Sequence, residues 1–532
     1  MKKLIFYAIV LGVVTQSCKR LDLAPLDRAS DLTFWNTQAD AVNAVNACYG
    51  DLYDAETWAF SESLSDNAYT RSGNGNLVRD VGNGNYDAAH PLMQQVWAQR
   101  YAGIRRCNTV LDNIDRVPDL DEGLLKRLKA ETRFIRAFHY FTLMNHFGGV
   151  PLVEHEISIE ESRNVQRADR QAVADFVRSE LELAYADLPV NTEYGSADLG
   201  RITKGAAMGL LARTHLYDAN WQGVIDAAER FFANEAGSYG LFPSYAGLFK
   251  PENENNQEVI LDVQYMPIRR THGIQYFMIP PTEGGYAAIS PSQELVDSYL
   301  MENGAPIGQA GSGYDESNPY AGRDPRLAAT VVYDNAPWTR PDGSTVTIRT
   351  APGNGENSLG FSSNTTPTGY YVAKFFDPEA QNLVNSGLNL ILLRYADILL
   401  MYAEAKNELG QFDEAVWNRT IAALRQRAGF THPDALAFDA QGTQDTWRDM
   451  IRRERRVELA MEGLRIADIR RWRIAENVLN GWLHGMKTDR SSADGGYERV
   501  DLRTFDAEKH YLWPIPLSER DRNPNLDTNP GW

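Results

Sequence analysis

The stretch of sequence that decides the fold reads Leu392-Leu393-Arg394-Tyr395-Ala396-Asp397-Ile398-Leu399-Leu400-Met401-Tyr402-Ala403. Its apolar side chains recur at positions 392, 395, 396, 399, 400 and 403, which is the spacing of one face of an α-helix. We therefore predict an amphipathic helix that begins at Leu392 and packs one side into a core.

A second amphipathic helix is expected around residues 452–464. Its apolar side consists of Val457, Ala460, Met461 and Leu464. The opposite side carries glutamates at positions 454, 458 and 462 among arginines at 452, 453, 455 and 456. Because these charges lie about one turn apart, we expect them to form ion pairs along the helix.

Helical periodicity continues over much of the chain, so we expect a mainly α fold. Further helices are predicted near residues 38–54, 93–115, 123–147, 169–187, 203–218, 221–235 and 412–428. Two segments look alike: in residues 212–224 and 405–415 a helix is followed by a short turn and by an aromatic residue that opens a second helix. This order is typical of stacked helical hairpins of the tetratricopeptide type.

Residues 237–390 have a different composition. Gly and Pro are dense there, as in Pro280-Pro281-Thr282-Glu283-Gly284-Gly285, and extended runs such as Val259–Val263 and Thr345–Ile348 are short. Loops of this length inside a compact protein are usually functional or disordered. Because the segment is rich in Tyr and Trp, we expect a functional role.

The N-terminus predicts export. Lysines at positions 2 and 3 precede an apolar run over residues 4–14, which is too short for a bilayer span of roughly 20 apolar residues. Residues 1–17 are therefore interpreted as a cleaved signal peptide. A small residue directly before Cys18 is the arrangement at which bacterial lipoproteins are cut and acylated, so Cys18 is expected to carry a lipid. The alternative is an ordinary secretory signal with an incidental cysteine.

Charge and composition exclude some partners. The chain has 532 residues, and 43% of them are hydrophobic, which is enough for a large core. Its formal net charge is −18, and it becomes −20 when the signal peptide is removed together with Lys2 and Lys3. Nucleic acids and anionic membrane surfaces require a cationic face and are poor partners.

The other cysteines, Cys48 and Cys107, are expected to be buried thiols, with a disulfide between them as the alternative.

The sequence contains none of the common catalytic motifs. It has no His-Glu-x-x-His pair, no Gly-x-Ser-x-Gly elbow, no phosphate-binding Gly-Lys-Ser/Thr loop and no Cys-x-x-Cys. We therefore expect neither an enzyme nor a cofactor. A structural Ca²⁺ is left open, because no EF-hand spacing appears.

Several motifs follow one another through nearly the whole chain. They include Phe34-Trp35-Asn36-Thr37, residues 130–141 and 147–152, Arg323-Asp324-Pro325-Arg326-Leu327, residues 393–405, 452–459 and 462–465, Pro514-Ile515-Pro516, and residues 523–526 and 529–532. In their order and joint presence they are similar to the SusD/RagB family, the outer-membrane nutrient-binding lipoproteins of the Bacteroidota.

The resemblance implies a SusD-like helical scaffold with tetratricopeptide-like helix pairs and a loop-rich ligand face with short strands. It also implies a partner, a SusC-like TonB-dependent transporter in the outer membrane. To this transporter the surface-exposed lipoprotein would deliver an oligosaccharide or polysaccharide without catalysis. Five charged residues of the shared motifs are interpreted as ion pairs that hold the helices together: Arg394, Asp397, Glu404, Glu458 and Arg465.

The expected organisation follows from this likeness. It comprises a signal peptide (1–17), a lipid-anchored leader (18–37), an N-terminal helical part (38–236), a loop-rich ligand-binding insertion (237–390) and a C-terminal helical part (391–532).

The ligand site is predicted from the chemistry of sugars. A sugar ring offers an apolar C–H face and a belt of hydroxyls, so its capture needs flat aromatic rings and fixed polar groups. Tyr and Trp in Gly-rich loops meet the first need, having only two side-chain torsions to freeze. The family takes its contacts from the loop ahead of the helix at 93–115 and from the irregular middle of the chain. Those regions supply Tyr86, Tyr286 and Trp338 for stacking and Asp66, Asn67, Arg71 and His90 for hydrogen bonds.

Alternatives remain open for these residues and for the function. Each aromatic ring could instead pack within its loop, and Asp66 and Asn67 could cap or turn the chain. Capture of peptides for the same kind of transporter is the second functional hypothesis. A helical-repeat interaction scaffold without a small ligand is the third.

Overall fold

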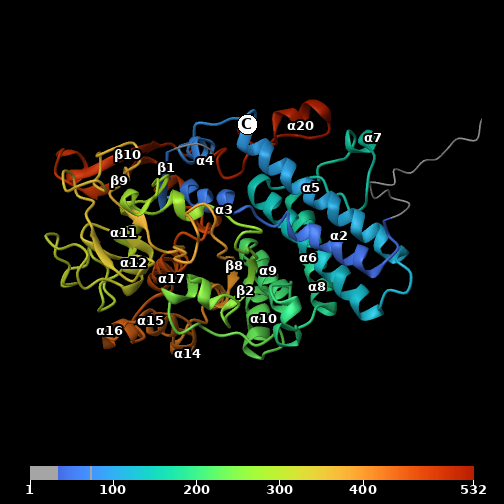
Figure 1. Cartoon of the computed structure of the whole chain (residues 1–532), viewed down its shortest axis with the longest axis horizontal. Coiled ribbons are helices and arrows are strands. Elements are labelled where there is room, and N and C mark those ends of the chain that lie inside the picture. Colours follow the sequence, from blue (N-terminus) through green and yellow to red (C-terminus); the bar gives the residue numbers. More distant parts are fainter. Residues whose placement is uncertain (1–33, 72–74) are drawn as a thin grey trace, which may run out of the picture.

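The computed structural model describes residues 34–71 and 75–532, and its larger elements are helices. Four long helices lie together at the right of Figure 1: α2 (Gln38–Tyr49), α5 (Pro91–Asn113), α6 (Glu122–Phe147) and α8 (Arg170–Asp187). Polar side chains begin them, as at α6, where Asp121 accepts a hydrogen bond from the backbone N–H of Leu124 at 2.8 Å. The predicted mainly α fold is confirmed.

Two helical hairpins continue this layer toward the middle of the molecule. The first is α9 (Lys204–Tyr217) with α10 (Trp221–Phe232), and the second is α13 (Tyr395–Glu408) with α14 (Glu414–Trp417). A π-helical turn over Asn418–Ala422 joins α14 to α15 (Ala423–Ala428). Since α10 packs on α13, the stacking of the two predicted hairpins is confirmed.

Apart from α17, which has 15 residues, the other elements are short. The helices are α3 (Ala55–Ser61), α4 (Gly75–Gly82), α7 (Ile159–Ser162), α11 (Gln293–Ser298), α12 (Pro325–Thr330), α16 (Pro433–Leu436), α17 (Gln444–Glu458), α18 (Arg465–Arg471), α19 (Ala475–Val478) and α20 (Leu517–Arg522). The antiparallel strand pairs are β1 (Ala68–Thr70) with β3 (Ile289–Pro291), β2 (Val259–Val263) with β8 (Leu390–Arg394), β4 (Val331–Val332) with β7 (Tyr371–Val372), β5 (Ala336–Thr339) with β6 (Thr345–Ile348), and β9 (Gly481–Lys487) with β10 (Tyr497–Arg503). Most of these pairs and the long loops lie opposite the four long helices (Figure 1).

The helix predicted from Leu392 begins three residues later than expected. Residues 392–394 belong to β8, which is buried along its whole length and pairs with β2 so that Val259 lies opposite Arg394. Pairing with a distant strand therefore overrides the helical spacing of these leucines. At Gly209 of α9 a Cβ would lie 2.3 Å from a methyl carbon of Leu393, so helix and strand are in close contact there.

The helix predicted around residues 452–464 is also shorter than expected. Helix α17 ends at Glu458, and the chain turns through Met461 and Gly463, whose φ angles are +65° and +74°, before α18. Distant groups satisfy this turn: Lys374 Nζ donates to the carbonyl of Ala460 at 2.8 Å, and the N–H of Gly463 donates to Glu62 at 2.7 Å.

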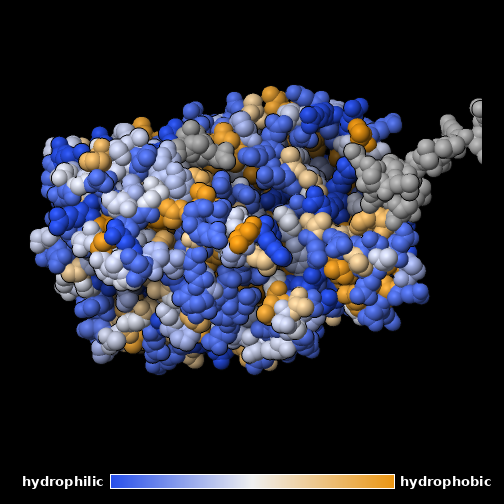
Figure 2. All heavy atoms as spheres, in the orientation of Figure 1, coloured by the Kyte–Doolittle hydropathy of each residue, from blue (hydrophilic) through white to orange (hydrophobic). Residues whose placement is uncertain are grey.

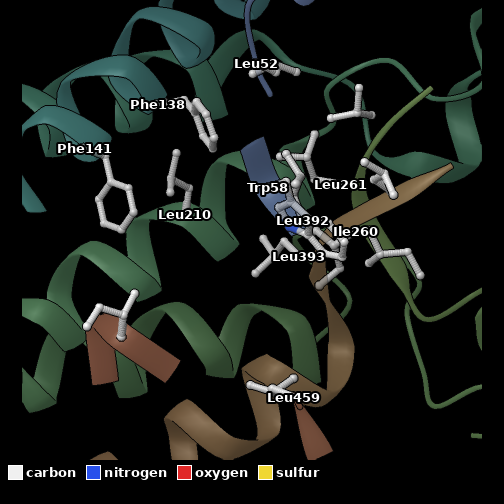
Figure 3. Packing of buried hydrophobic residues seen from close by; sticks show 14 of the residues in the cluster. Leu52, Trp58, Phe138, Phe141, Leu210, Ile260, Leu261, Leu392, Leu393 and Leu459 are labelled. Carbon is white, nitrogen blue, oxygen red and sulfur yellow. The ribbon is translucent and has the colours of Figure 1, made fainter. Parts of the chain in front are cut away.

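One hydrophobic core joins the helical layer to the loop-rich part. Figure 3 shows Phe138 and Phe141 of α6 and Leu210 of α9 on one side of it. Ile260 and Leu261 of β2 and Leu392 and Leu393 of β8 lie on the other side. The loops of residues 237–390 are therefore anchored in the same core as the helices.

A buried network of charges lies beside this core. Arg394 is 1% exposed and uses all five of its N–H donors. Its Nε and Nη2 donate to the carboxylate of Glu462 at 2.9 and 2.8 Å. Its Nη1 donates to Glu258 at 2.8 Å and to Glu458 at 2.7 Å. The second Nη2 donor reaches the carbonyl of Glu458 at 2.6 Å. The network continues through Arg326, which binds Glu458 at 2.9 Å, and through Arg427, which binds Glu258 at 2.6 Å.

The other predicted ion pairs are also present. Asp397 binds Arg455 at 2.5 Å, Glu404 binds Arg471 at 2.5 Å, and Arg465 binds Asp66 at 2.8 Å. The interpretation of these residues as ties between helices is confirmed. The expected pairing along one helix is wrong, because Glu454 and Glu458 bind arginines of other elements.

Several further predictions concern membranes and thiols. Among the described residues, no helix combines the length and apolar character that a membrane crossing needs. Cys48 and Cys107 are buried free thiols, and burial raises the pKa of Cys107 further above its usual range with the help of the Cys48 thiol. The signal peptide and Cys18 lie outside the described residues.

The Arg394 network predicts a large stability loss on mutation. Arg394→Met leaves three buried carboxylates without their shared cation, so the free energy of unfolding should fall by about 3–5 kcal/mol. Urea denaturation followed by tryptophan fluorescence measures this change. The matched control is Arg522→Met, which removes an exposed pair with Glu519 and should cost about 0–1 kcal/mol. Equal losses in the two variants would contradict the role of the network.

Candidate functional site

Arg71 follows strand β1 and is half-buried where three loops converge. Its backbone N–H donates to the carbonyl of Ala288 at 3.3 Å, which extends the β1–β3 pairing by one residue. One terminal nitrogen of the guanidinium donates to the carbonyl of Thr365, whereas Nε is buried without a hydrogen-bond partner. Within the described part of the chain, no carboxylate pairs with Arg71, so donors remain for a ligand.

The surroundings of Arg71 are aromatic. Burial lowers the pKa of Arg71, and the nearby hydroxyl groups of Tyr286, Tyr69 and Tyr371 partly oppose this shift. A guanidinium among phenol rings without a carboxylate combines a cation and hydrogen-bond donors with flat apolar surface. That combination suits a neutral, hydroxyl-rich ligand.

Tyr286 and Tyr276 form a pair of nearly parallel rings beside Arg71. Their centroids are 5.9 Å apart with an interplanar angle of 10°, and both side chains are half-buried. The backbone fixes the pair, because the N–H of Tyr286 donates to the carbonyl of Tyr276 at 2.7 Å. A Cβ at Gly285 would lie 2.0 Å from the carbonyl oxygen of Ile279, so only glycine permits this close approach.

Polar bonds tie the surrounding loops to one another. Arg340, after β5, holds Glu283 with two hydrogen bonds of 2.8 Å. Asn357 accepts from the backbone N–H of Thr282 at 3.0 Å and donates to its hydroxyl at 2.7 Å. The loop of Asn357 also carries Phe361, which is 61% exposed. We call Arg71, Tyr276 and Tyr286, together with the exposed ring of Phe361 on the neighbouring loop, the aromatic face.

The aromatic face presents rings and hydrogen-bond donors. Glu283, an acidic side chain on one of its loops, is paired with Arg340. Across residues 34–71 and 75–532, no three His, Cys, Asp or Glu side chains are placed to hold a metal ion together. The arrangement is suited to stacking on a flat apolar ligand surface and donating hydrogen bonds to its oxygens.

Asp66 and Asn67 occupy interior positions and do not join the aromatic face. Burial alone would raise the pKa of Asp66, but Arg456 and Arg465 outweigh burial and hold it below its usual range. The amide of Asn67 donates to Glu62 at 2.6 Å and accepts from Arg456 at 2.8 Å. Both side chains are at most 2% exposed, and their hydrogen bonds go to other parts of the scaffold. The prediction that Asp66 and Asn67 donate or accept hydrogen bonds at the ligand site is therefore corrected.

Tyr86 and His90 lie together at the C-terminal tail. The Tyr86 ring stacks on His510 with centroids 5.1 Å apart and packs on Trp532 at 4.9 Å, and burial raises its pKa to about 12. Nδ1 of His90 accepts the backbone N–H of Leu92 at 3.3 Å, which caps α5. The structure gives both side chains packing and capping contacts and does not bring them to Arg71.

Trp338 was predicted as a stacking platform, but it points into the protein. It lies on β5, is 5% exposed, and packs on Phe376 with centroids 4.8 Å apart. In a two-stranded hairpin alternate residues face opposite sides, and Trp338 falls on the inner one. This correction leaves Arg71 and Tyr286 as the predicted residues that the structure brings together.

Two members of the aromatic face, Tyr276 and Phe361, were not predicted as ligand contacts, although the sequence contains signals for both. Tyr276 lies in the same irregular segment as Tyr286. Phe361 stands between glycine and serine in Gly360-Phe361-Ser362, a setting in which a large apolar side chain has little to pack against. An isolated aromatic residue in a Gly- and Ser-rich loop is the pattern that would have found it.

Comparison with known proteins identifies the family. The family model described as "SusD family" matches residues 249–532, more than half of the chain. A second model, described as "Starch-binding associating with outer membrane", matches residues 25–216. The chain belongs to the SusD family.

One curated SusD-family relative and one solved structure match it over nearly their whole length, and a further relative matches it over a shorter stretch. The SusD-like protein P25 of Formosa agariphila is 27% identical over 93% of this chain and 92% of its own. The crystal structure of a SusD-like carbohydrate-binding protein from Bacteroides fragilis superimposes with a TM-score of 0.85 at 29% identity, covering 93% of this chain and all of that one. The starch-binding protein SusD of Bacteroides thetaiotaomicron is 29% identical over 30% of this chain and 28% of its own.

The different positions of two SusD-family loop aromatics predict different costs of truncation. Trp338→Ala empties a buried site and should lower the free energy of unfolding by about 3–5 kcal/mol. Tyr286→Ala removes a half-buried ring at the surface and should cost about 1 kcal/mol. Urea denaturation of both variants checks the order, and a larger loss for Tyr286→Ala would contradict the placement of these two rings.

Proposed function

We propose that the protein captures a glycan at the surface of the outer membrane, leaves it chemically unchanged, and delivers it to a SusC-like TonB-dependent transporter. The observation that carries the proposal is the aromatic face, in which a guanidinium with no carboxylate partner among the described residues stands beside two nearly parallel tyrosine rings. Relatives support the ligand class, since one is a SusD-like carbohydrate-binding protein and another a starch-binding protein.

The proposed binding mode follows from the chemistry of the face. The C–H face of a sugar would stack on Tyr286 or Phe361, while Arg71 donates to ring or hydroxyl oxygens. Cross-linking of the loops by Arg340 and Asn357 reduces the entropy lost on binding. Because no covalent step is involved, the glycan can leave the face intact.

Delivery requires that the protein stay at the outer membrane. The family model that matches residues 25–216 is described as associating with the outer membrane, which supports this location. A lipid on Cys18 would provide the tether that keeps the protein beside a transporter.

Affinity measurements test the proposed ligand class. Isothermal titration of the mature protein against a panel of polysaccharides and peptides should show binding of at least one polysaccharide. Tyr286→Ala should weaken that binding about ten-fold, which corresponds to about 1.4 kcal/mol. The matched control is Tyr185→Ala, a half-buried ring of α8 on the helical side, which should leave affinity unchanged. Binding of peptides alone, or equal affinities for both variants, would overturn the proposal.

The tether predicts a separation of anchoring from binding. Cys18→Ala should release soluble protein that binds the same polysaccharide with unchanged affinity but no longer supports growth on it. Fractionation of cells followed by titration of the released protein measures both properties. A Cys18→Ala protein that stayed in the membrane fraction would show that the lipid is not the anchor.

A further inference from the structure

A cavity lies in the helical part, away from the aromatic face. It has a volume of about 370 Å³ and is bounded by the C-terminal end of α6, by α8, α9 and α18, and by residues 511 and 512 of the tail. Figure 1 places α6, α8 and α9 together in the right half of the molecule. The volume falls within the range of small-molecule sites, about 300–1,000 Å³. None of its lining residues belongs to the aromatic face.

Four arginines line this cavity, and two of them are neutralised. Arg170 pairs with Asp218 at 2.6 Å, and Arg471 pairs with Glu404 at 2.5 Å and with Asp468 at 2.9 Å. Arg470 and Arg473 have no carboxylate partner within the described residues. The cavity therefore carries an excess of positive charge in a chain whose net charge is −18.

Arg470 is the less solvated of the two unpaired cations. Its Nε is buried and makes no hydrogen bond within the described residues. Burial lowers the pKa of Arg470, and the hydroxyl of Tyr86 partly opposes this shift. A guanidinium without a counter-charge in such a place costs stability, and an anion in the cavity would offset the cost. Arg473 is exposed and lies over the ring of Tyr511 at 4.1 Å, so the cavity opens to solvent on its side.

The rest of the lining offers uncharged polar atoms and flat rings. Nδ1 of His146 and the hydroxyl of Tyr511 are both buried without a hydrogen-bond partner in the described chain. The His146 ring is fixed by stacking on Trp513, with centroids 4.0 Å apart and an interplanar angle of 15°. Burial, aided by Arg470 and Arg100, lowers the pKa of His146 to about 3, so the imidazole is neutral and can bond a hydroxyl group.

We propose that this cavity binds a small hydroxylated carboxylate of the uronic acid class. The carboxylate meets the guanidinium groups of Arg470 and Arg473, for which planar oxyanions are the natural partners. The ligand's hydroxyls meet His146 and Tyr511, and its C–H face lies on the rings of Tyr217 and Tyr511. The inference is independent of the proposed glycan capture, because the two sites share no residue.

Titration of the mature protein with D-glucuronate, D-glucose and inorganic phosphate tests the proposal. Glucuronate should bind with one-to-one stoichiometry, and glucose and phosphate at least ten-fold more weakly. Arg470→Gln and Arg473→Gln should each lower glucuronate affinity at least ten-fold. Arg105→Gln, an exposed arginine of α5, and Tyr286→Ala at the aromatic face should leave it unchanged.

Thermal unfolding separates a binding role of Arg470 from a structural one. Without ligand, Arg470→Gln should unfold at the same temperature as the parent protein or higher, because an uncompensated charge is removed. With glucuronate, the parent protein should gain a higher midpoint and the variant should not. Because Arg473 is exposed, Arg473→Gln keeps the test valid if Arg470→Gln fails to fold.

Four results with the parent protein and the two arginine variants would overturn the proposal. They are the absence of glucuronate binding, equal binding of glucose, binding of phosphate as tight as that of glucuronate, and glucuronate affinity unchanged in both arginine variants. Loss of glucuronate binding in Tyr286→Ala would place the acid at the aromatic face and would also overturn it.

Discussion

The structure depends on the hydrogen bonds of one buried guanidinium, that of Arg394. Charges removed from water are tolerated only when every donor and acceptor is satisfied, and Arg394 meets this condition with five donors to Glu258, Glu458 and Glu462. These partners come from the start of β2, the end of α17 and the turn before α18. A single side chain thus joins segments that lie between 64 and 136 residues from it along the chain, and it fixes the point at which strand β8 becomes helix α13.

The same interaction positions the aromatic face. Strands β2 and β8 enclose the long irregular segment, so the Arg394 network holds both of its ends in the core. Between these ends the chain is stiffened by the bonds of Arg340 to Glu283 and of Asn357 to Thr282. Rings on such loops can stay half-exposed without collapsing inward. The outer surface seen in Figure 2 is largely hydrophilic, with hydrophobic residues in small, scattered groups.

Periodicity predicted most helices, because an amphipathic face depends on residues close together in the sequence. The resemblance to the SusD/RagB family predicted the arrangement of the scaffold. It failed at Leu392 and near Met461, where pairing with β2 and bonds from Lys374 and Glu62 decide the backbone. The site was harder, because composition marks a loop as functional without saying which side chains face outward. Asp66 meets arginines about 400 residues away, a partnership that no local pattern reveals. Arg71 and Tyr286 were found because their residue types suit sugars, and only the fold brings them together.

The most direct test of the account is hydrogen–deuterium exchange of the mature protein with and without its tightest-binding polysaccharide. Backbone amides report local opening, and a ligand held by the aromatic face should slow exchange in the loops around Tyr276, Tyr286 and Phe361. Exchange in α2, α5 and α8 should stay the same. Protection confined to the helical layer, with the three loops unchanged, would contradict the claim that the scaffold built on Arg394 presents a glycan-binding face.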